Sequence, residues 1–404
     1  MKKNYLQIAL LIILVASIVF YHTRAGEDYL PYMQEMAGTH SEITFISGQV
    51  YEASQDGQVI GYFDRQSAIG YAGPIEVLVF VGVDGLVKDL RVVKQIETPS
   101  FFQKVISKGF VDDLLEKEAN SPFELGVDLD AVTNATYTSR AIAEAVRKAS
   151  HNIAVTKLNM QVPKTAGFKL PLEDYLILAL LLAVFILQKL KQSKLRYLTL
   201  LVGFLLIGYW QKSLLSLANI SSVLAGNIPW QSLPFWLVLL VGVLFLILIT
   251  GRNLYCYWMC PFGALSELLG AFGKFGRMNY KPCERSVQRF KNLRLILAWA
   301  ALVFAFILNN PSISSYEIFA PLFAWEGAPV QWLLLPIMLF AGVFVLRFWC
   351  RFFCPVGGIL DLLVKWRRSC SECLKSRVKR DKSKELKQLP MVSSQAEQSP
   401  QQQA

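Results

Sequence analysis

The sequence predicts a protein in two parts. An exported α+β domain is followed by an all-α polytopic membrane domain with about six transmembrane helices, counting an N-terminal anchor. Three observations predict this fold class. The 404-residue chain is 53% hydrophobic, its apolar residues come in long runs, and its positive charge gathers in a few of the segments between those runs.

Six apolar runs are candidate membrane spans. A helix that crosses a hydrocarbon layer of about 30 Å needs roughly 20 residues. The runs are Leu6–Tyr21, Tyr175–Leu187, Tyr197–Tyr209, Leu233–Thr250, Leu293–Leu308 and Val330–Phe348. The second and third runs are the shortest, so a buried hairpin is an alternative there. We expect all six to span.

Lysine and arginine set the expected orientation, because cytoplasmic loops hold positive charge. Basic residues concentrate after the second run, after the fourth run and in the tail, which places these segments in the cytoplasm. They include Lys189, Lys191, Lys194, Arg196, Arg252, Lys274, Arg277, Lys365, Arg367 and Arg368. The connections Lys212–Ser232 and Asn309–Gln331 hold a single lysine between them and are expected outside. The net charge of +11 is therefore a topology signal, and we expect no nucleic-acid partner.

The first apolar run is either a retained anchor or a cleaved secretory signal, since Thr23 and Ala25 form a small-residue cleavage pattern. Its length favours a signal anchor over residues 1–25. Residues 26–170 are exported in both cases, which in a bacterium means a periplasmic domain attached to the inner (cytoplasmic) membrane. We expect a five-helix membrane domain over residues 171–366 and a basic, then disordered, cytoplasmic tail over 367–404.

The exported segment has the pattern of an α+β domain. The strand-like runs Ile75–Val83 and Leu86–Val93 flank Asp84-Gly85, a common hairpin turn. Amphipathic helices are predicted at Phe101–Lys117 and Arg140–His151. The segment contains no cysteine, so it forms no disulfide.

A hydroxyl-rich segment precedes the second of these helices: Thr133-Asn134-Ala135-Thr136-Tyr137-Thr138-Ser139. Thr138 and Ser139 are expected at the N-cap, where side-chain oxygens satisfy free amides and the helix dipole favours an anion such as phosphate. Taken alone, the pattern is that of an ordinary N-cap. The whole segment resembles the Ser-Gly-Ala-Thr-x-Thr-Ser signature of FMN-binding domains of the NqrC/RnfG type, found in the sodium-pumping quinone reductase and the Rnf complex.

The resemblance implies a covalent cofactor. In that family the last threonine of the signature, here Thr138, is joined to the FMN phosphate by a phosphodiester bond that a dedicated flavin transferase makes. The turn that binds FMN would then comprise Thr133, Asn134, Ala135, Thr136 and Ser139 beside Thr138. Thr133 and Asn134 replace the serine and glycine of the signature, and asparagine tolerates the left-handed backbone that glycine supplies.

Two earlier segments extend the resemblance. Gly70–Val77 is similar to the glycine-rich strand entry of the same domain, and Glu97-Thr98-Pro99-Ser100 to its Glu-Thr-Pro turn. Glu97 and Thr98 are therefore expected near the isoalloxazine ring. No nicotinamide fingerprint or acid–base pair accompanies these motifs, so we predict no catalytic residue, and the flavin is expected to relay electrons.

Four of the seven cysteines form a repeat, Cys256-Tyr-Trp-Met-Cys260-Pro261 and Cys350-Arg-Phe-Phe-Cys354-Pro355. The two motifs end two apolar runs about 94 residues apart, which indicates an internal duplication with pseudo-twofold packing. Four thiols brought together in this way form a cage that suits an iron–sulfur cluster, for which we expect the 4Fe-4S type, or zinc. A dithiol–disulfide conduit and simple packing are the alternatives.

The other cysteines lie in basic segments. Cys370-Ser-Glu-Cys373 has the spacing of metal ligands, and Cys283 is isolated. These three thiols make a second complete site only with a ligand from a partner.

Taken together, the flavin domain and the paired CxxxCP motifs resemble the NosR/NirI family, and the core resembles NapH-like quinol-dehydrogenase membrane proteins. The resemblance covers nearly the whole chain except the tail, which lacks the ferredoxin repeats of that family. It implies an electron-transfer component of a membrane oxidoreductase system. Electrons would pass between a cytoplasmic or quinol donor and a periplasmic acceptor, through covalent FMN and a cysteine-ligated iron–sulfur centre.

Two other functions fit the sequence. One is a redox-sensing regulator or assembly factor of the NosR/NirI type, and the other is a zinc-stapled bundle with a flavin-free domain. The relay also poses a geometric problem, because a bilayer core of about 30 Å would separate the two cofactors. A deeper cysteine cage, a partner or a quinone would have to fill that gap.

Overall fold

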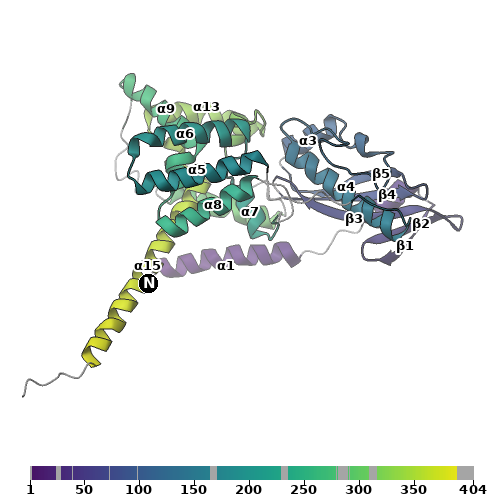
Figure 1. Ribbon diagram of the computed structural model, residues 1–404, viewed down its shortest axis with the longest axis horizontal. Coiled ribbons are helices and arrows are strands. Elements are labelled where there is room, and N and C mark those ends of the chain that lie inside the picture. The colour runs from purple at the N-terminus through teal and green to yellow at the C-terminus, as the bar shows by residue number, and fades with distance from the viewer. Residues whose placement is uncertain are drawn as a thin grey trace, which may run out of the picture.

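The computed structural model describes residues 2–23, 29–38, 40–71, 73–97, 99–163, 171–228, 235–278, 280, 290, 292–308 and 316–388. Of residues 2–7, 373–375 and 377–388 it describes only the backbone. A β-sheet domain lies at one end of the molecule and a helical bundle at the other (Figure 1).

The sheet is antiparallel, and its strands follow one another in chain order. They are β1 (Glu42–Ser47), β2 (Val50–Gln55), β3 (Gln58–Ile69), β4 (Pro74–Gly82) and β5 (Val87–Gln95). The turn that joins β4 to β5 contains Asp84 and Gly85, with Gly85 at φ +80°. The hairpin that the sequence predicts at this point is therefore present.

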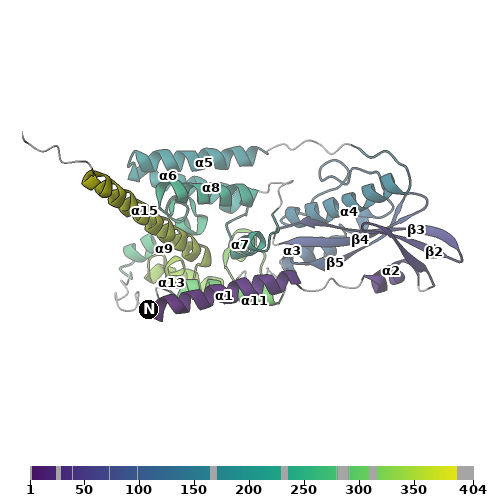
Figure 2. The same cartoon turned by 90° about the horizontal axis from the view of Figure 1, so that it is seen from below.

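Helices cover both faces of the sheet. Helix α4 (Thr136–Thr156) packs on β3 and β4, with α3 (Pro99–Ser107) beside it, and their buried residues form one core. Helix α2 (Leu30–Ala37) lies across the opposite face, where Met33 packs with Phe63 and Phe80 (Figure 2). Helix α3 ends earlier than predicted because Gly109 turns the chain at φ +72°; the short 3-10 helix η1 (Asp112–Leu114) follows.

The bundle is built from short helices around a core that includes Trp236. Its elements are α5 (Leu172–Lys189), η2 (Ser193–Leu195), α6 (Arg196–Gly203), π-helix η3 (Phe204–Trp210), α7 (Leu217–Leu224), α8 (Phe235–Thr250), π-helix η4 (Tyr255–Met259), α9 (Pro261–Phe275), α11 (Leu293–Ile307), α12 (Phe319–Phe323), α13 (Pro329–Phe344), α14 (Phe348–Phe352) and α15 (Pro355–Gln388). Helix α1 (Lys2–Thr23) runs along the bundle and packs on α11, where the Trp299 indole donates to the Leu10 carbonyl at 2.9 Å (Figure 2).

The predicted polytopic domain of six transmembrane helices is wrong for this structure. Among the described residues, no helix combines the length and the apolar character needed to cross a membrane. Helix length explains much of the difference. Helices α8 and α13 have 16 residues each and α11 has 15, whereas about 20 are needed. The run Tyr197–Tyr209 is divided between α6, of 8 residues, and π-helix η3.

Side-chain contacts join the sheet domain to the bundle. Lys104 of α3 pairs with Glu326 at 2.5 Å, and the Asn219 side-chain amide of α7 donates to the Tyr71 carbonyl at 3.4 Å. Ala324, which follows α12, is buried in the apolar core of the sheet domain. The end of the sheet domain that carries the start of α4 therefore packs against the bundle (Figure 1).

Candidate functional site

The predicted flavin-attachment residue Thr138 is buried and paired with Glu97. Its hydroxyl donates to Glu97 Oε2 at 2.8 Å, and the two side chains are each only 1% exposed. Gly70 leaves the space that the carboxylate fills, because a Cβ there would lie 2.3 Å from Glu97 Oε1. The structure thus brings together two predicted site residues that are 41 positions apart in the chain. Thr98 lies outside the described residues.

The hydroxyl-rich segment forms a turn into α4, but its geometry differs from the predicted N-cap. The helix begins at Thr136 with Ala135 at the cap, so Thr138 and Ser139 lie inside the first turn. The Ser139 hydroxyl donates back to the Ala135 carbonyl at 3.1 Å. Asn134 adopts φ +66°, the left-handed conformation expected where the signature has glycine. Thr133 and Thr136 are both exposed.

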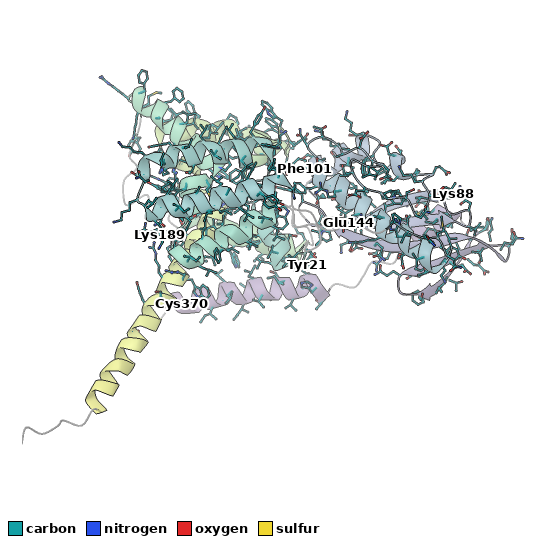
Figure 3. The ribbon with its side chains drawn as sticks, viewed as in Figure 1. Tyr21, Lys88, Phe101, Glu144, Lys189 and Cys370 are labelled. Atoms are coloured by element: carbon teal, nitrogen blue, oxygen red, sulfur yellow. The ribbon has the colours of Figure 1, made fainter. Side chains whose placement is uncertain are left out.

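Two tyrosines lie near this turn on the side of the bundle, and Ser213 follows Lys212, whose ammonium group donates to Asn134 of the turn. The Tyr71 ring lies 6.2 Å from that of Tyr137 and 5.9 Å from that of Phe101, which faces the bundle in Figure 3. Burial raises the pKa of Tyr137 to about 12. Ser100 and Ser213 have buried hydroxyl oxygens without a hydrogen-bond partner in the described part of the chain. Orphaned donors beside a helix N-terminus fit a phosphorylated ligand such as FMN.

The two CxxxCP motifs have equivalent backbone geometry. Each ends a short helix, η4 or α14, and each proline opens a longer one, α9 or α15. The Cys260 amide donates to the carbonyl five residues earlier at 2.9 Å, and so does the Cys354 amide. The Cys260 and Cys354 carbonyls both accept an amide four residues later, at 3.0 and 3.2 Å. These matched bonds agree with the duplication that the sequence indicates.

The motifs place their thiols around a common space. A Cβ on Gly357 would lie 3.6 Å from Cys354 Sγ and 3.8 Å from Cys256 Sγ, so glycine leaves open a cradle that sulfurs from both motifs border. Burial first, and then the neighbouring Cys350 thiol, raises the pKa of Cys260 to about 11. Burial followed by the other motif thiols likewise raises the pKa of Cys256 and of Cys354. Two buried and two half-buried thiols that interact with one another beside a glycine cradle fit an iron–sulfur cluster.

The spacing of the ligand side chains bears on the kind of metal group that the site can hold. Within the described ranges, no three His, Cys, Asp or Glu side chains gather closely enough to hold a metal ion. An ion such as zinc needs thiolates at about 2.3 Å from one point, whereas a four-iron cluster takes them at four separate corners. Of the remaining cysteines, Cys370 is exposed and unpaired with another cysteine on α15. The Cys373 side chain and all of Cys283 lie outside the described residues.

Two arginines lie beside the thiols. Arg347 donates to the Cys256 carbonyl at 3.4 Å and to Glu267 at 2.6 Å, and Arg294 donates to the Cys350 carbonyl at 3.3 Å. Their guanidinium groups oppose the burial that raises the pKa of Cys350. Positive charge at this point stabilises thiolates and the added electron of a reduced cluster.

Packed aromatic and carboxyl groups connect the two sites. Glu317 accepts the Leu217 amide of α7 at 2.6 Å and is 2% exposed. It interacts electrostatically with Tyr71 on the flavin side and with Tyr316 on the cysteine side. The Tyr316 hydroxyl donates to the Phe353 carbonyl at 2.9 Å, and its ring lies 6.3 Å from that of Trp349, the neighbour of Cys350.

Two protein-domain families match this chain at the two sites. The FMN-binding domain family matches residues 70–151, which include Glu97 and Thr138. The 4Fe-4S binding domain family matches residues 232–278 and 329–369, which include all four motif cysteines. The chain therefore contains an FMN-binding domain and a 4Fe-4S binding domain. It is similar to NirI and NosR, and its cofactors are FMN and an iron–sulfur cluster.

Several curated proteins are similar to parts of this chain. The chain is 28% identical to YccM of Escherichia coli, named as a candidate electron transport protein, over 38% of this chain and 46% of YccM. It is 30% identical to NirI of Paracoccus denitrificans over 34% of this chain and 21% of NirI. It is 27% identical to the regulatory protein NosR of Pseudomonas aeruginosa over 46% of this chain and 28% of NosR. The matches span less than half the length of each of these relatives.

The sequence did not point to several residues that the structure places at the sites. Each of these residues acts through contacts with residues far away in the chain. They are Tyr71, Lys212, Glu317, Arg347 and Trp349. One signal was present. Lys212 is the one lysine in the two connections that are expected outside, Lys212–Ser232 and Asn309–Gln331.

Proposed function

We propose that this protein relays electrons between a quinol or cytoplasmic donor and a periplasmic acceptor. FMN bound covalently to Thr138 supplies one- and two-electron chemistry, and a cluster held by Cys256, Cys260, Cys350 and Cys354 supplies one-electron chemistry. The observation that carries the proposal is the packed path between the sites. It runs from Glu97 and Tyr71 through Glu317 and Tyr316 to Trp349.

The path supports a route for electrons between the two sites. Electron tunnelling weakens steeply with distance and with gaps, and close-packed interiors offer few gaps. Tyr71 belongs to the sheet domain, whereas Tyr316 and Trp349 belong to the bundle, so the path crosses the domain junction within one chain.

A cavity beside the cysteines is a candidate docking place for a quinol head group. Its volume is about 360 Å³, and Gln188, Lys191, Asn253 and Tyr257 are among its lining residues. Asn253 links the cavity to the cysteine site, since its side-chain oxygen accepts the Cys256 amide at 3.2 Å. In the described part of the chain, Gln188 Oε1 is buried without a hydrogen-bond partner, as a polar group that awaits a ligand would be.

We further propose that the bundle associates with a lipid bilayer of the bacterial inner membrane, with the FMN domain on the periplasmic side. Exposed apolar side chains recur at helical spacing on α5, α8 and α13. They are Leu178, Leu182 and Ile186; Val241, Phe245 and Leu248; and Leu333, Ile337 and Phe340. Large apolar patches of this kind mark lipid or protein contact surfaces. The basic end of the bundle, marked by Lys189, lies away from the sheet domain (Figure 3).

Intact-mass spectrometry tests flavin attachment. The full chain is coexpressed with a flavin transferase as wild type, Thr138→Val and Thr136→Val. We expect an FMN-sized adduct on the wild type and on a further variant, Thr156→Val, which serves as the matched control because Thr156 is an exposed threonine at the other end of α4; loss of the adduct in Thr136→Val as well would assign Thr136 to the FMN-binding turn. The adduct should be absent from Thr138→Val. An adduct that persists on Thr138→Val would refute the assignment.

A redox-sensing regulator is the second candidate function. It is favoured by the similarity to NosR, which is named a regulatory protein. The two functions differ in rate. Flavin reduction at many turnovers per second after addition of quinol to reconstituted protein supports the relay, and reduction over hours supports the sensor.

A further inference from the structure

A lysine of the bundle lies at the flavin-attachment turn of the sheet domain. Lys212 Nζ donates to the Asn134 side-chain oxygen at 2.5 Å. Lys212 belongs to the segment between η3 and α7, and Asn134 precedes the first residue of α4 by two positions. Both residues adopt the left-handed conformation, with φ +50° and +66°. Non-glycine residues in that region are uncommon and tend to occur at functional sites.

The charges at the turn require a cation once FMN is attached. A phosphodiester on Thr138 carries a negative charge. Glu97, which is only 1% exposed, places a second acidic group beside it. Esterification also removes the Thr138 proton that Glu97 accepts. Two acidic groups in a buried place repel each other unless a positive group compensates. The amides at the start of α4 supply only part of that compensation.

We propose that Lys212 binds the FMN phosphate, so that the bundle completes the cofactor site of the sheet domain. This inference rests on the proposed attachment at Thr138. An ammonium group has three donors, so Lys212 can bind Asn134 and a phosphate oxygen together. The neighbouring Ser213, 1% exposed and with an orphaned hydroxyl within the described residues, lies in the same segment.

The consequence is that cofactor binding and domain docking support each other. The phosphate would lie between a turn of the sheet domain and a lysine of the bundle. A flavin held in this way stabilises the junction at which the Asn219 side chain of the bundle donates to the Tyr71 carbonyl of the sheet domain.

The test compares FMN with riboflavin, which lacks the phosphate. Full-length protein produced without a flavin transferase is titrated with each flavin, and binding is followed by quenching of flavin fluorescence. Lys212→Met should weaken FMN binding about tenfold, the size expected for loss of one charge-assisted hydrogen bond, and leave riboflavin binding unchanged. Lys212→Arg should retain most of the affinity for FMN. Raising the salt concentration should weaken FMN binding less in Lys212→Met than in the wild type.

Two control variants separate phosphate binding from docking. Lys104→Met breaks the Lys104–Glu326 pair at the same junction without touching Asn134, and Lys189→Met removes an exposed charge from the remote end of the bundle (Figure 3). Neither substitution should change the affinity for FMN relative to the affinity for riboflavin. Equal weakening of both flavins in Lys212→Met would overturn the proposal, as would unchanged FMN binding. A wild type that takes up no flavin by titration or by coexpression would instead refute the proposed function, and this inference with it.

Discussion

The hydrogen bond between Thr138 and Glu97 depends on a glycine. Gly70 lies where any side chain would displace the Glu97 carboxylate, at 2.3 Å from a Cβ. The sequence indicated Gly70, Glu97 and Thr138 separately, through their motifs. It could not indicate that they meet, because the contact depends on how β3, the segment after β5 and α4 pack.

We expect Gly70→Ala to destabilise the protein and to reduce flavin attachment. Glu97 is too buried to move aside freely, so the overpacked site should lose about 1–3 kcal/mol of unfolding free energy. Gly73→Ala in the same turn should cost less, since its nearest contact, Ile96 Cβ, would lie at 3.3 Å. Thermal unfolding and the mass adduct measure both effects. Equal flavin attachment in Gly70→Ala and wild type would contradict this role of Gly70.

A buried carboxyl at the start of α5 gives the protein a pH-dependent stability. Asp174 is fully buried, and in the described structure neither of its side-chain oxygens has a hydrogen-bond partner. Burial, aided by Glu173, raises the pKa of Asp174 to about 6 from its ordinary value of 3.8. The folded state therefore binds this proton more tightly than the unfolded state. The resulting stabilisation is complete below about pH 3.8 and is lost as pH rises through about 6.

Asp174→Asn should remove this dependence. Its melting temperature should exceed that of the wild type by several degrees at pH 8 and differ little at pH 4. Glu173→Gln is the control, because Glu173 is a half-buried neighbour and its replacement should have a smaller effect. Thermal melts at the two pH values decide. If the wild type is more stable than Asp174→Asn at pH 8, the Asp174 carboxylate is not an unpaired buried charge that destabilises the fold.

At the scale of elements, α9 and α13 approach each other closely. A Cβ on Gly273 of α9 would lie 1.9 Å from the Val343 carbonyl oxygen of α13. These helices adjoin the two halves of the cysteine site, since α9 begins directly after Cys260 and α13 ends shortly before Cys350. Their spacing therefore fixes the distance between the two motifs.

Gly273→Ala should push the helices apart and lower the iron content of the purified protein. Backbone cannot move aside as a flexible side chain can, so a loss of about 1–3 kcal/mol in stability is expected. Gly342→Ala on α13 is the matched control, because its Cβ would meet Leu269 at an ordinary 3.5 Å. Iron analysis and thermal unfolding compare the two. Full iron content in Gly273→Ala would show that this contact does not set the cysteine geometry.

Local patterns predicted some elements better than others. The Asp84-Gly85 turn and the strands beside it follow from short-range rules. Membrane spans were inferred from runs of apolar residues, and hydropathy does not report where a helix stops. The division of Tyr197–Tyr209 between α6 and π-helix η3 depends on packing, such as the approach of Gly203 to the Met259 carbonyl, at 2.2 Å from an added Cβ.

At the scale of the whole molecule, the sequence indicated two cofactor sites but not their connection. The contacts that join the domains link residues very far apart in the chain, such as Asn219 with Tyr71 and Lys104 with Glu326. No short-range pattern encodes them. The path from Tyr71 to Trp349 therefore emerged only from the packed structure, and with it the case for electron exchange inside one chain.

The most direct test of that case is the concentration dependence of electron exchange between the two cofactors. Full-length protein with both cofactors is partly photoreduced without oxygen, and flavin absorbance is followed after the flash. Exchange within one chain predicts a first-order rate that is the same at every protein concentration. A rate that rises in proportion to protein concentration, or no exchange on the timescale of turnover, would contradict the account.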